Sequence, residues 1–131
     1  ESAQIMITAM QEDSKIGCIF PSIYRELKQF MVSQDIPLLG FDGKDFIIKN
    51  VLQKLAINSN FCRNEIFFSA GAMMWYRPRA LHQMFGDKFT YNDFLENQNK
   101  HGGTLSHVVE RISSLVALHN GYTVKSLTRH P

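Results

Sequence analysis

The chain has 131 residues, of which 44% are hydrophobic and 20% are charged, and its formal net charge is +2. This length favours one domain with a single core, and the composition is that of a globular protein. Because the net charge is small and the Lys and Arg residues are scattered singly, we expect no nucleic-acid partner. The chain begins at Glu1, inside an expected helix, so we interpret it as a piece of a longer protein.

The number of cysteines and the length of the apolar runs indicate which compartment to expect and whether the chain crosses a membrane. Cys18 and Cys62 are the only cysteines, too few and too far apart for a zinc signature or a disulfide framework, which favours a reducing, cytoplasmic compartment. No apolar run approaches the ~18 residues of a membrane span, and no signal peptide is visible. We therefore expect no transmembrane segment.

The first half of the chain alternates helical and strand patterns. Residues 2–12 place apolar side chains at helical spacing, and the apolar run over 15–20 is typical of a strand buried on both faces. A helix capped by Ser22 is expected over 23–34, followed by a turn-rich connection and a second helix over 44–57. Helices alternating with strands predict the α/β class.

The second half continues this alternation. Residues 66–76 predict a strand, and Pro78 opens a short helix whose buried side includes Leu81, Met84 and Phe85. Residues 86–100 form a polar loop with embedded aromatic residues, in which 92–95 can form one helical turn.

A long helix is expected next, over 105–119, and a last strand over 122–127. Thr104 is its predicted N-cap and Gly121 its left-handed stop. An apolar stripe along this helix is expected to face the core. The polar side is predicted to carry His107, Glu110, Arg111 and Ser114.

Three polar side chains on this long helix are the most suggestive group. His107, Glu110 and Arg111 lie within about one turn, and a carboxylate beside an imidazole can serve as a general base. The helix N-terminus near Thr104 would also favour an anion. The alternative is that this H-x-x-E-R sequence is an ordinary solvated helix surface.

Trp75, Tyr76 and Arg77 end the strand predicted over 66–76, at the position where ligands of α/β sheets tend to bind. An aromatic ring beside an arginine suits a sugar or a phosphate-bearing acceptor. The alternative is that Trp75 is a core residue. The sequence has no G-x-G-x-x-G, P-loop, G-x-S-x-G or D-x-D, and its histidines form no i, i+4 pair, so we assign no metal ligands.

Two blocks of the sequence resemble the rhamnan synthesis protein F family, bacterial proteins of cell-wall rhamnose-polysaccharide assembly that are regarded as glycosyltransferases. An apolar F-x-A-G-x-M-F-W-x-R-P-x-A-L pattern matches Phe68, Ala70, Gly71, Met73, Trp75, Arg77, Pro78, Ala80 and Leu81. A G-T-L-x-H-x-x-E-R pattern and a later G-Y match Gly103, Thr104, Leu105, His107, Glu110, Arg111, Gly121 and Tyr122. The family's E-D-x-K-x-G turn also resembles residues 12–17. Met74 and Gly102 depart from the pattern, where the family has Phe and an acidic residue.

The resemblance implies a nucleotide-sugar-dependent glycosyltransferase with a partial GT-A-like, Rossmann-like arrangement, a small mixed sheet flanked by helices. Residues 1–131 would be a single domain, the C-terminal, acceptor-side part of the enzyme, inactive alone and without a cofactor of its own. A separate donor half would bind the nucleotide sugar with Mg²⁺ or Mn²⁺. The acceptor would be a lipid-linked saccharide at the cytoplasmic face of the cell membrane.

The same resemblance implies roles for single residues. Glu110 would be the catalytic base and His107 would orient it, while Arg111 would meet the charge of the diphosphate. Trp75 would stack on a sugar ring, and Arg77 and Thr104 would contact substrate. Two alternatives stay open: a non-catalytic carbohydrate-binding or partner-docking module of the same pathway, and an α/β domain with no sugar role.

Overall fold

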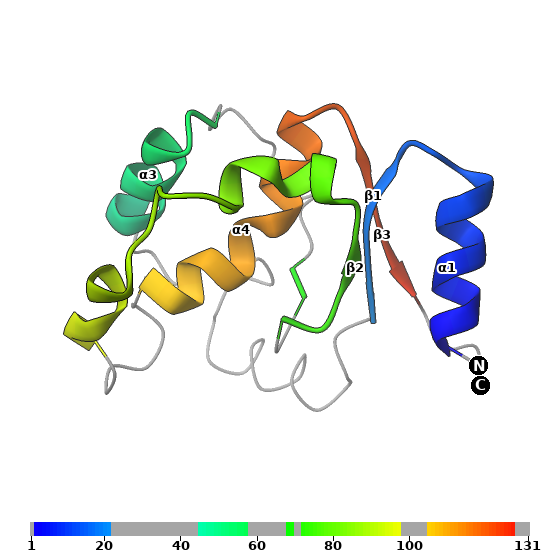
Figure 1. Cartoon of the computed structure of the whole chain (residues 1–131), viewed down its shortest axis with the longest axis horizontal. Coiled ribbons are helices and arrows are strands. Elements are labelled where there is room, and N and C mark those ends of the chain that lie inside the picture. Colours follow the sequence, from blue (N-terminus) through cyan, green and yellow to red (C-terminus); the bar gives the residue numbers. More distant parts are fainter. Residues whose placement is uncertain (1, 22–44, 58–67, 70–71, 98–104, 128–131) are drawn as a thin grey trace.

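The computed structural model describes residues 2–21, 45–57, 68–69, 72–97 and 105–127. In this part of the chain three strands form one mixed sheet with helices on both faces, which confirms the predicted α/β class (Figure 1). α1 lies along one face of the sheet, and α4 with α3 lies on the other. With η marking 3₁₀ helices, the elements are α1 (Ser2–Glu12), β1 (Ile16–Pro21), α3 (Asp45–Lys54), β2 (Trp75–Tyr76), η3 (Pro78–Met84), η4 (Tyr91–Asn97), α4 (Leu105–His119) and β3 (Thr123–Leu127).

β1 is the central strand of the sheet. β2 pairs with it antiparallel on one side, and β3 pairs with it parallel on the other. A register shift between Ile16 and Cys18 marks a bulge at the intervening glycine. Because an extra residue interrupts the alternation of side chains, Ile16 and Ile19 both pack against Met6 of α1, whereas Cys18 joins the cluster formed with α4. The sheet therefore has an α1 face and an α4 face.

The main core lies on the α4 face. The apolar stripe predicted for α4 is confirmed, since Val108, Ile112, Leu115 and Val116 pack with the apolar side of α3. The prediction that Ser114 belongs to a polar side is wrong, because Ser114 is buried. The second half of α4 is enclosed all round, from Ile112 to Ala117. Its first half keeps an accessible side.

α3 and α4 end in the same backbone motif. After α4, the Gly121 amide donates to the Leu118 carbonyl and the Tyr122 amide donates to the Ala117 carbonyl, with Gly121 at φ +78°. The predicted left-handed stop is therefore confirmed. After α3 the corresponding position is held by Ala56 at φ +55°, a conformation that costs an alanine free energy that a glycine would not lose.

The long strand predicted over 66–76 is wrong in the part that the structure describes, where only β2 is a strand. The Ser69 hydroxyl donates to the Met73 carbonyl at 2.6 Å, the Ala72 amide donates to the Ser69 carbonyl, and Ala72 lies at φ +54°. Ser69, Ala72 and Met73 thus form a local turn where the strand was expected, because a side-chain hydroxyl offers the backbone an alternative to the hydrogen bonds of a sheet. The helix predicted over 23–34 and the connection over 35–43 lie outside the described residues.

The helix that Pro78 was predicted to open is η3. Ala80 and Leu81 are its buried residues. Phe85 was predicted on the buried side, but 51% of it is exposed. The reason is that Phe85 adopts an extended conformation, φ −103°, immediately after the last helical residue, so it leaves the helix periodicity. The short turn predicted within the polar loop is confirmed as η4.

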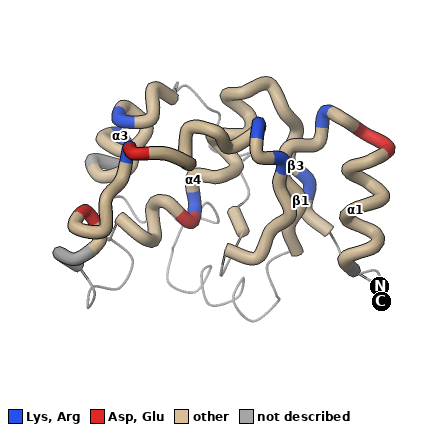
Figure 2. Tube along the Cα trace, viewed as in Figure 1, with Lys and Arg blue, Asp and Glu red and all other residues tan. Residues whose placement is uncertain are grey.

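Charged residues are distributed over the described elements rather than gathered on one. Figure 2 shows Lys and Arg on α3, on α4 and around the sheet. Among the described residues, Lys54 of α3 pairs with Asp93 of η4 at 3.5 Å, and Lys125 of β3 pairs with Asp13, in the turn after α1, at 3.8 Å. Both pairs lie at the surface, where such pairs contribute little stability.

Candidate functional site

The polar group predicted on α4 lies on the half of that helix that is not fully enclosed. His107, Glu110 and Arg111 are each half-buried. The guanidinium carbon of Arg111 lies 5.6 Å from the centre of the Phe68 ring, a cation–π contact with a buried side chain. All three residues take part in non-covalent contacts. The arrangement presents a carboxylate and an imidazole one helical turn apart, with the neighbouring arginine held against an aromatic ring.

Thr104, the predicted cap of this helix and a predicted substrate contact, lies outside the described residues. The described helix begins at Leu105. The prediction for Thr104 therefore stays a prediction.

Trp75 lies on the α1 face of the sheet. In β2 it pairs with Ile19, and opposite residues of an antiparallel pair share a face, so the indole lies on the same side as Ile19 and α1. Trp75 is 42% exposed, which makes it an edge-strand residue rather than a core residue. The structure therefore separates Trp75 from the α4 group by the thickness of the sheet.

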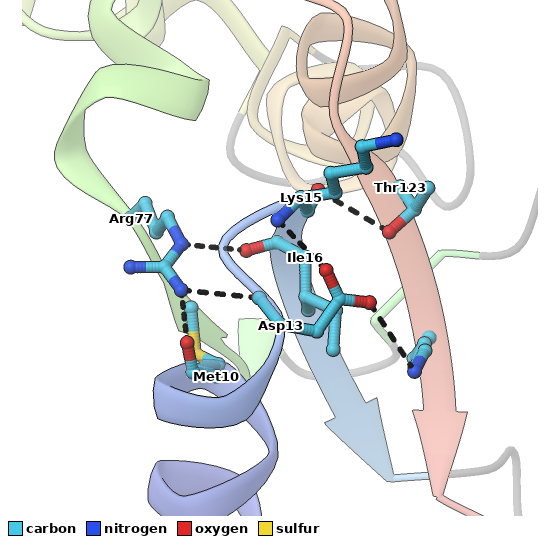
Figure 3. Close-up of polar contacts among 7 residues, drawn as sticks. Met10, Asp13, Lys15, Ile16, Arg77 and Thr123 are labelled. Carbon is cyan, nitrogen blue, oxygen red and sulfur yellow. Dashed lines mark hydrogen bonds and ion pairs between the residues drawn. The ribbon is translucent and has the colours of Figure 1, made fainter.

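Arg77 follows the same alternation and also points toward α1. Figure 3 shows its guanidinium between the end of α1 and the start of β1. Nε donates to the Ile16 carbonyl at 2.8 Å, and one terminal nitrogen donates to the carbonyls of Asp13, at 3.2 Å, and Met10. The side chain thus satisfies carbonyls at the C-terminus of α1, where the helix dipole favours a cation. A structural role is what this geometry shows for Arg77.

The turn that Arg77 contacts is itself held by Asp13. One carboxylate oxygen accepts from the Lys15 amide at 2.9 Å (Figure 3). The other faces the Lys125 ammonium. The Lys15 carbonyl in turn accepts from the Thr123 amide at 2.8 Å. The E-D-x-K-x-G segment therefore joins α1, β1 and β3 through its backbone.

The position of Arg77 corrects one premise of the sequence analysis. Its amide donates to the Gly17 carbonyl, near the amino end of β1. Because β2 runs antiparallel to β1, the chain leaves β2 at the amino ends of β1 and β3 and not at their carboxyl ends. Ligands of open α/β sheets bind outside the carboxyl ends, so this rule does not support a site at the end of β2.

Sequence reasoning missed an aromatic pair on the α4 face. Tyr76 pairs with Cys18, so its ring lies on the opposite face from Trp75. It stacks on Phe85, with ring centres 5.5 Å apart and an angle of 27° between the planes. The signal in the sequence is the alternation in β2, which assigns Trp75 and Tyr76 to opposite faces once the pairing with β1 is known.

Two titratable groups outside the predicted site have shifted pKa values. Burial raises the pKa of the Cys18 thiol to about 12, which removes it as a nucleophile at neutral pH. Hydrogen bonds from the Thr90 amide and hydroxyl, and the Lys54 ammonium, hold the pKa of Asp93 below its usual value. The same hydrogen bonds from Thr90 to the Asp93 carboxylate hold the start of η4. The Lys54 ammonium also lies 4.8 Å from the centre of the Phe89 ring.

Among the described residues, no group of three or more His, Cys, Asp or Glu could hold a metal ion. None of the described helices is both long enough and apolar enough to cross a membrane. A shallow depression of about 310 Å³ lies along α1, lined by Gln4, Ile5, Thr8, Ala9 and Glu12, and its lining includes none of the predicted site residues.

Comparison with known proteins identifies a family. The sequence model of rhamnan synthesis protein F matches residues 1–122 of the chain. No curated protein and no solved structure matches it significantly. The matched range includes every element of the described structure up to the end of α4.

Proposed function

Because the chain belongs to the rhamnan synthesis protein F family, we propose that it is the acceptor-side part of a glycosyltransferase that builds a cell-surface polysaccharide. Membership places the chain in rhamnan synthesis; the transferase role is the proposal. The observation that carries it is the uneven enclosure of α4. The helix buries every residue from Ile112 to Ala117, yet keeps His107 and Glu110 half-buried on its first half.

Glu110 is the proposed general base. In an inverting transfer a carboxylate removes the proton of the acceptor hydroxyl as that oxygen attacks the anomeric carbon, and the nucleoside diphosphate leaves with the bonding electron pair. His107, one turn away, is the proposed orienting partner. Arg111 lies next to Glu110 and is held against Phe68, which lowers the entropy cost of ordering its side chain. We propose that its charge meets the diphosphate.

The donor half is proposed to lie outside this chain. It would bind the nucleotide sugar in a GT-A-like arrangement, with Mg²⁺ or Mn²⁺ if the enzyme uses a metal. Among the described residues no cluster of three or more His, Cys, Asp or Glu side chains could hold such an ion. The proposed place of action is the cytoplasmic face of the cell membrane, with a lipid-linked saccharide as acceptor.

The test is a substitution of Glu110 in the full-length transferase. Glu110→Gln keeps the size of the side chain but removes the base, so we expect turnover to fall by about 10²-fold or more, with saccharide binding retained. Glu12→Gln, an exposed carboxylate at the end of α1, is the matched control and is expected to leave turnover unchanged. Unchanged turnover in Glu110→Gln would show that Glu110 is not the base.

The second candidate is a non-catalytic carbohydrate-binding module of the same pathway. It is favoured by the separation of Trp75 from the α4 group and by the engagement of Arg77 with backbone carbonyls. Under this alternative both Glu110→Gln and a larger Glu110→Ala change would leave turnover of the parent enzyme intact. Binding of saccharide by the chain would still be observed.

A further inference from the structure

We propose that Tyr76 and Phe85 form a stacking platform for a pyranose ring of the polysaccharide. The platform is a binding site separate from Trp75, which lies on the other face of the sheet. The choice of a saccharide as ligand rests on the proposed function. The existence of the platform rests on the geometry of the two rings.

The two rings are stacked and still open to solvent. Their planes differ by 27° with centres 5.5 Å apart, and Tyr76 and Phe85 remain 41% and 51% exposed. Stacked aromatic side chains are commonly buried in the core of a protein or at an interface. Here each ring covers one side of the other, and a large part of both stays accessible.

The backbone that carries the two rings is held in place by strand pairing and by side-chain hydrogen bonds. Tyr76 is paired with the buried Cys18 in the central strand. η3, which carries the chain to Phe85, is tied to the end of α4 because the side-chain amides of Gln83 and Asn120 exchange hydrogen bonds of 2.8 and 2.6 Å. Asn120 also donates to the Ala80 carbonyl at 2.9 Å. A preorganised pair of rings loses little conformational entropy when a ligand binds.

The chemistry of the rings selects the ligand. The face of an aromatic ring carries partial negative charge and attracts polarised C–H groups, which one face of a pyranose presents. In a 6-deoxyhexose such as rhamnose, C6 is a methyl group instead of a hydroxymethyl group, which increases the apolar surface that can be covered. The platform lies on the α4 face, the same side of the sheet as the helix that carries Glu110. A sugar stacked there would belong to the acceptor chain.

The test measures saccharide affinity on the 131-residue chain by NMR titration with a rhamnose tetrasaccharide. We expect Tyr76→Ala and Phe85→Ala each to weaken binding roughly three- to tenfold, as the loss of one aromatic contact would. Tyr76→Phe keeps the ring and is expected to retain most of the affinity. The control is Tyr91→Ala, an exposed aromatic on η4, which is expected to leave affinity unchanged. Trp75→Ala tests the predicted sugar contact on the opposite face in the same titration. Circular dichroism checks that each variant is folded.

Two outcomes would overturn the platform. One is binding of the tetrasaccharide that neither alanine variant weakens, or that Trp75→Ala weakens instead. The other is the absence of saccharide binding together with self-association that Phe85→Ala abolishes, which would make the rings a contact between copies of the chain. Failure of the proposed function is seen separately, because Glu110→Gln tests turnover, whereas the platform variants test affinity.

Discussion

At the scale of single residues, Gly17 lies where three segments of the chain pack too closely to leave room for a side chain. A Cβ atom built at this position would lie 2.6 Å from Cβ of Tyr122 and 2.9 Å from Cβ of Ala80. Glycine is thus required because the backbone of β1 approaches η3 and the start of β3 closely, and not because of its φ angle. The three residues come from three separate parts of the sequence that resemble the family patterns, and they meet at one point of the fold.

Gly17→Ala should therefore destabilise the chain. The added methyl group meets two Cβ atoms that cannot rotate away, so the backbone must shift, and overpacking of this kind costs about 1–3 kcal/mol. Urea unfolding followed by circular dichroism measures the loss. Adding Ala80→Gly to the same chain removes one of the two contacts and should recover part of it. An unchanged unfolding midpoint for Gly17→Ala would show that the close approach does not exist.

At the scale of elements, Arg77 joins α1 to the strand pair of β1 and β2. Its hydrogen bonds reach the carbonyls of Ile16 and Asp13 as well as that of Met10. A lysine has the same charge but cannot present several donors in one plane. We expect Arg77→Lys to lose about 2–4 kcal/mol of the free energy of unfolding, since hydrogen bonds to charged groups contribute about 1.5–3 kcal/mol each.

The control for this substitution is Arg79→Lys, an exposed arginine two residues further along. It should change stability little. If Arg77→Lys were as stable as the parent chain but weakened saccharide or phosphate binding, the predicted substrate-binding role of Arg77 would hold and the structural role would be minor.

Elements with strong periodicity or clear caps were predictable. α1 and α4 occupy the predicted ranges, and Gly121 ends α4 as expected, because apolar spacing and a left-handed glycine are properties of the local sequence. The failure at 66–76 has a local cause that periodicity does not detect. An apolar run there contains Ser69, whose hydroxyl stabilises a turn, and Ala72 adopts a positive φ angle that alanine seldom takes.

At the scale of the whole molecule, the candidate site depended on information that the sequence does not contain. Residues of α4 could be placed on one side of their helix from spacing alone. The relation of β2 to that helix requires the strand order, the antiparallel pairing with β1 and the bulge at Gly17. These three facts assign Trp75 to the α1 face and Tyr76 to the α4 face. The aromatic residue of β2 on the same side as α4 is therefore Tyr76, and not Trp75 as the sequence predicted.

This assignment of faces can be tested by thermodynamic coupling. Tyr76 and Phe85 are in contact, so the double-mutant cycle with alanine should give a coupling of about 0.5–1.5 kcal/mol in the free energy of unfolding. Trp75 and Phe85 lie on opposite faces, so their cycle should be additive within about 0.5 kcal/mol. Urea unfolding of the five alanine variants and the parent chain supplies both cycles. Comparable coupling in the Trp75–Phe85 cycle would mean that both aromatic residues lie on the α4 face, and Trp75 would then return to the group of residues that could contact the same sugar as Glu110.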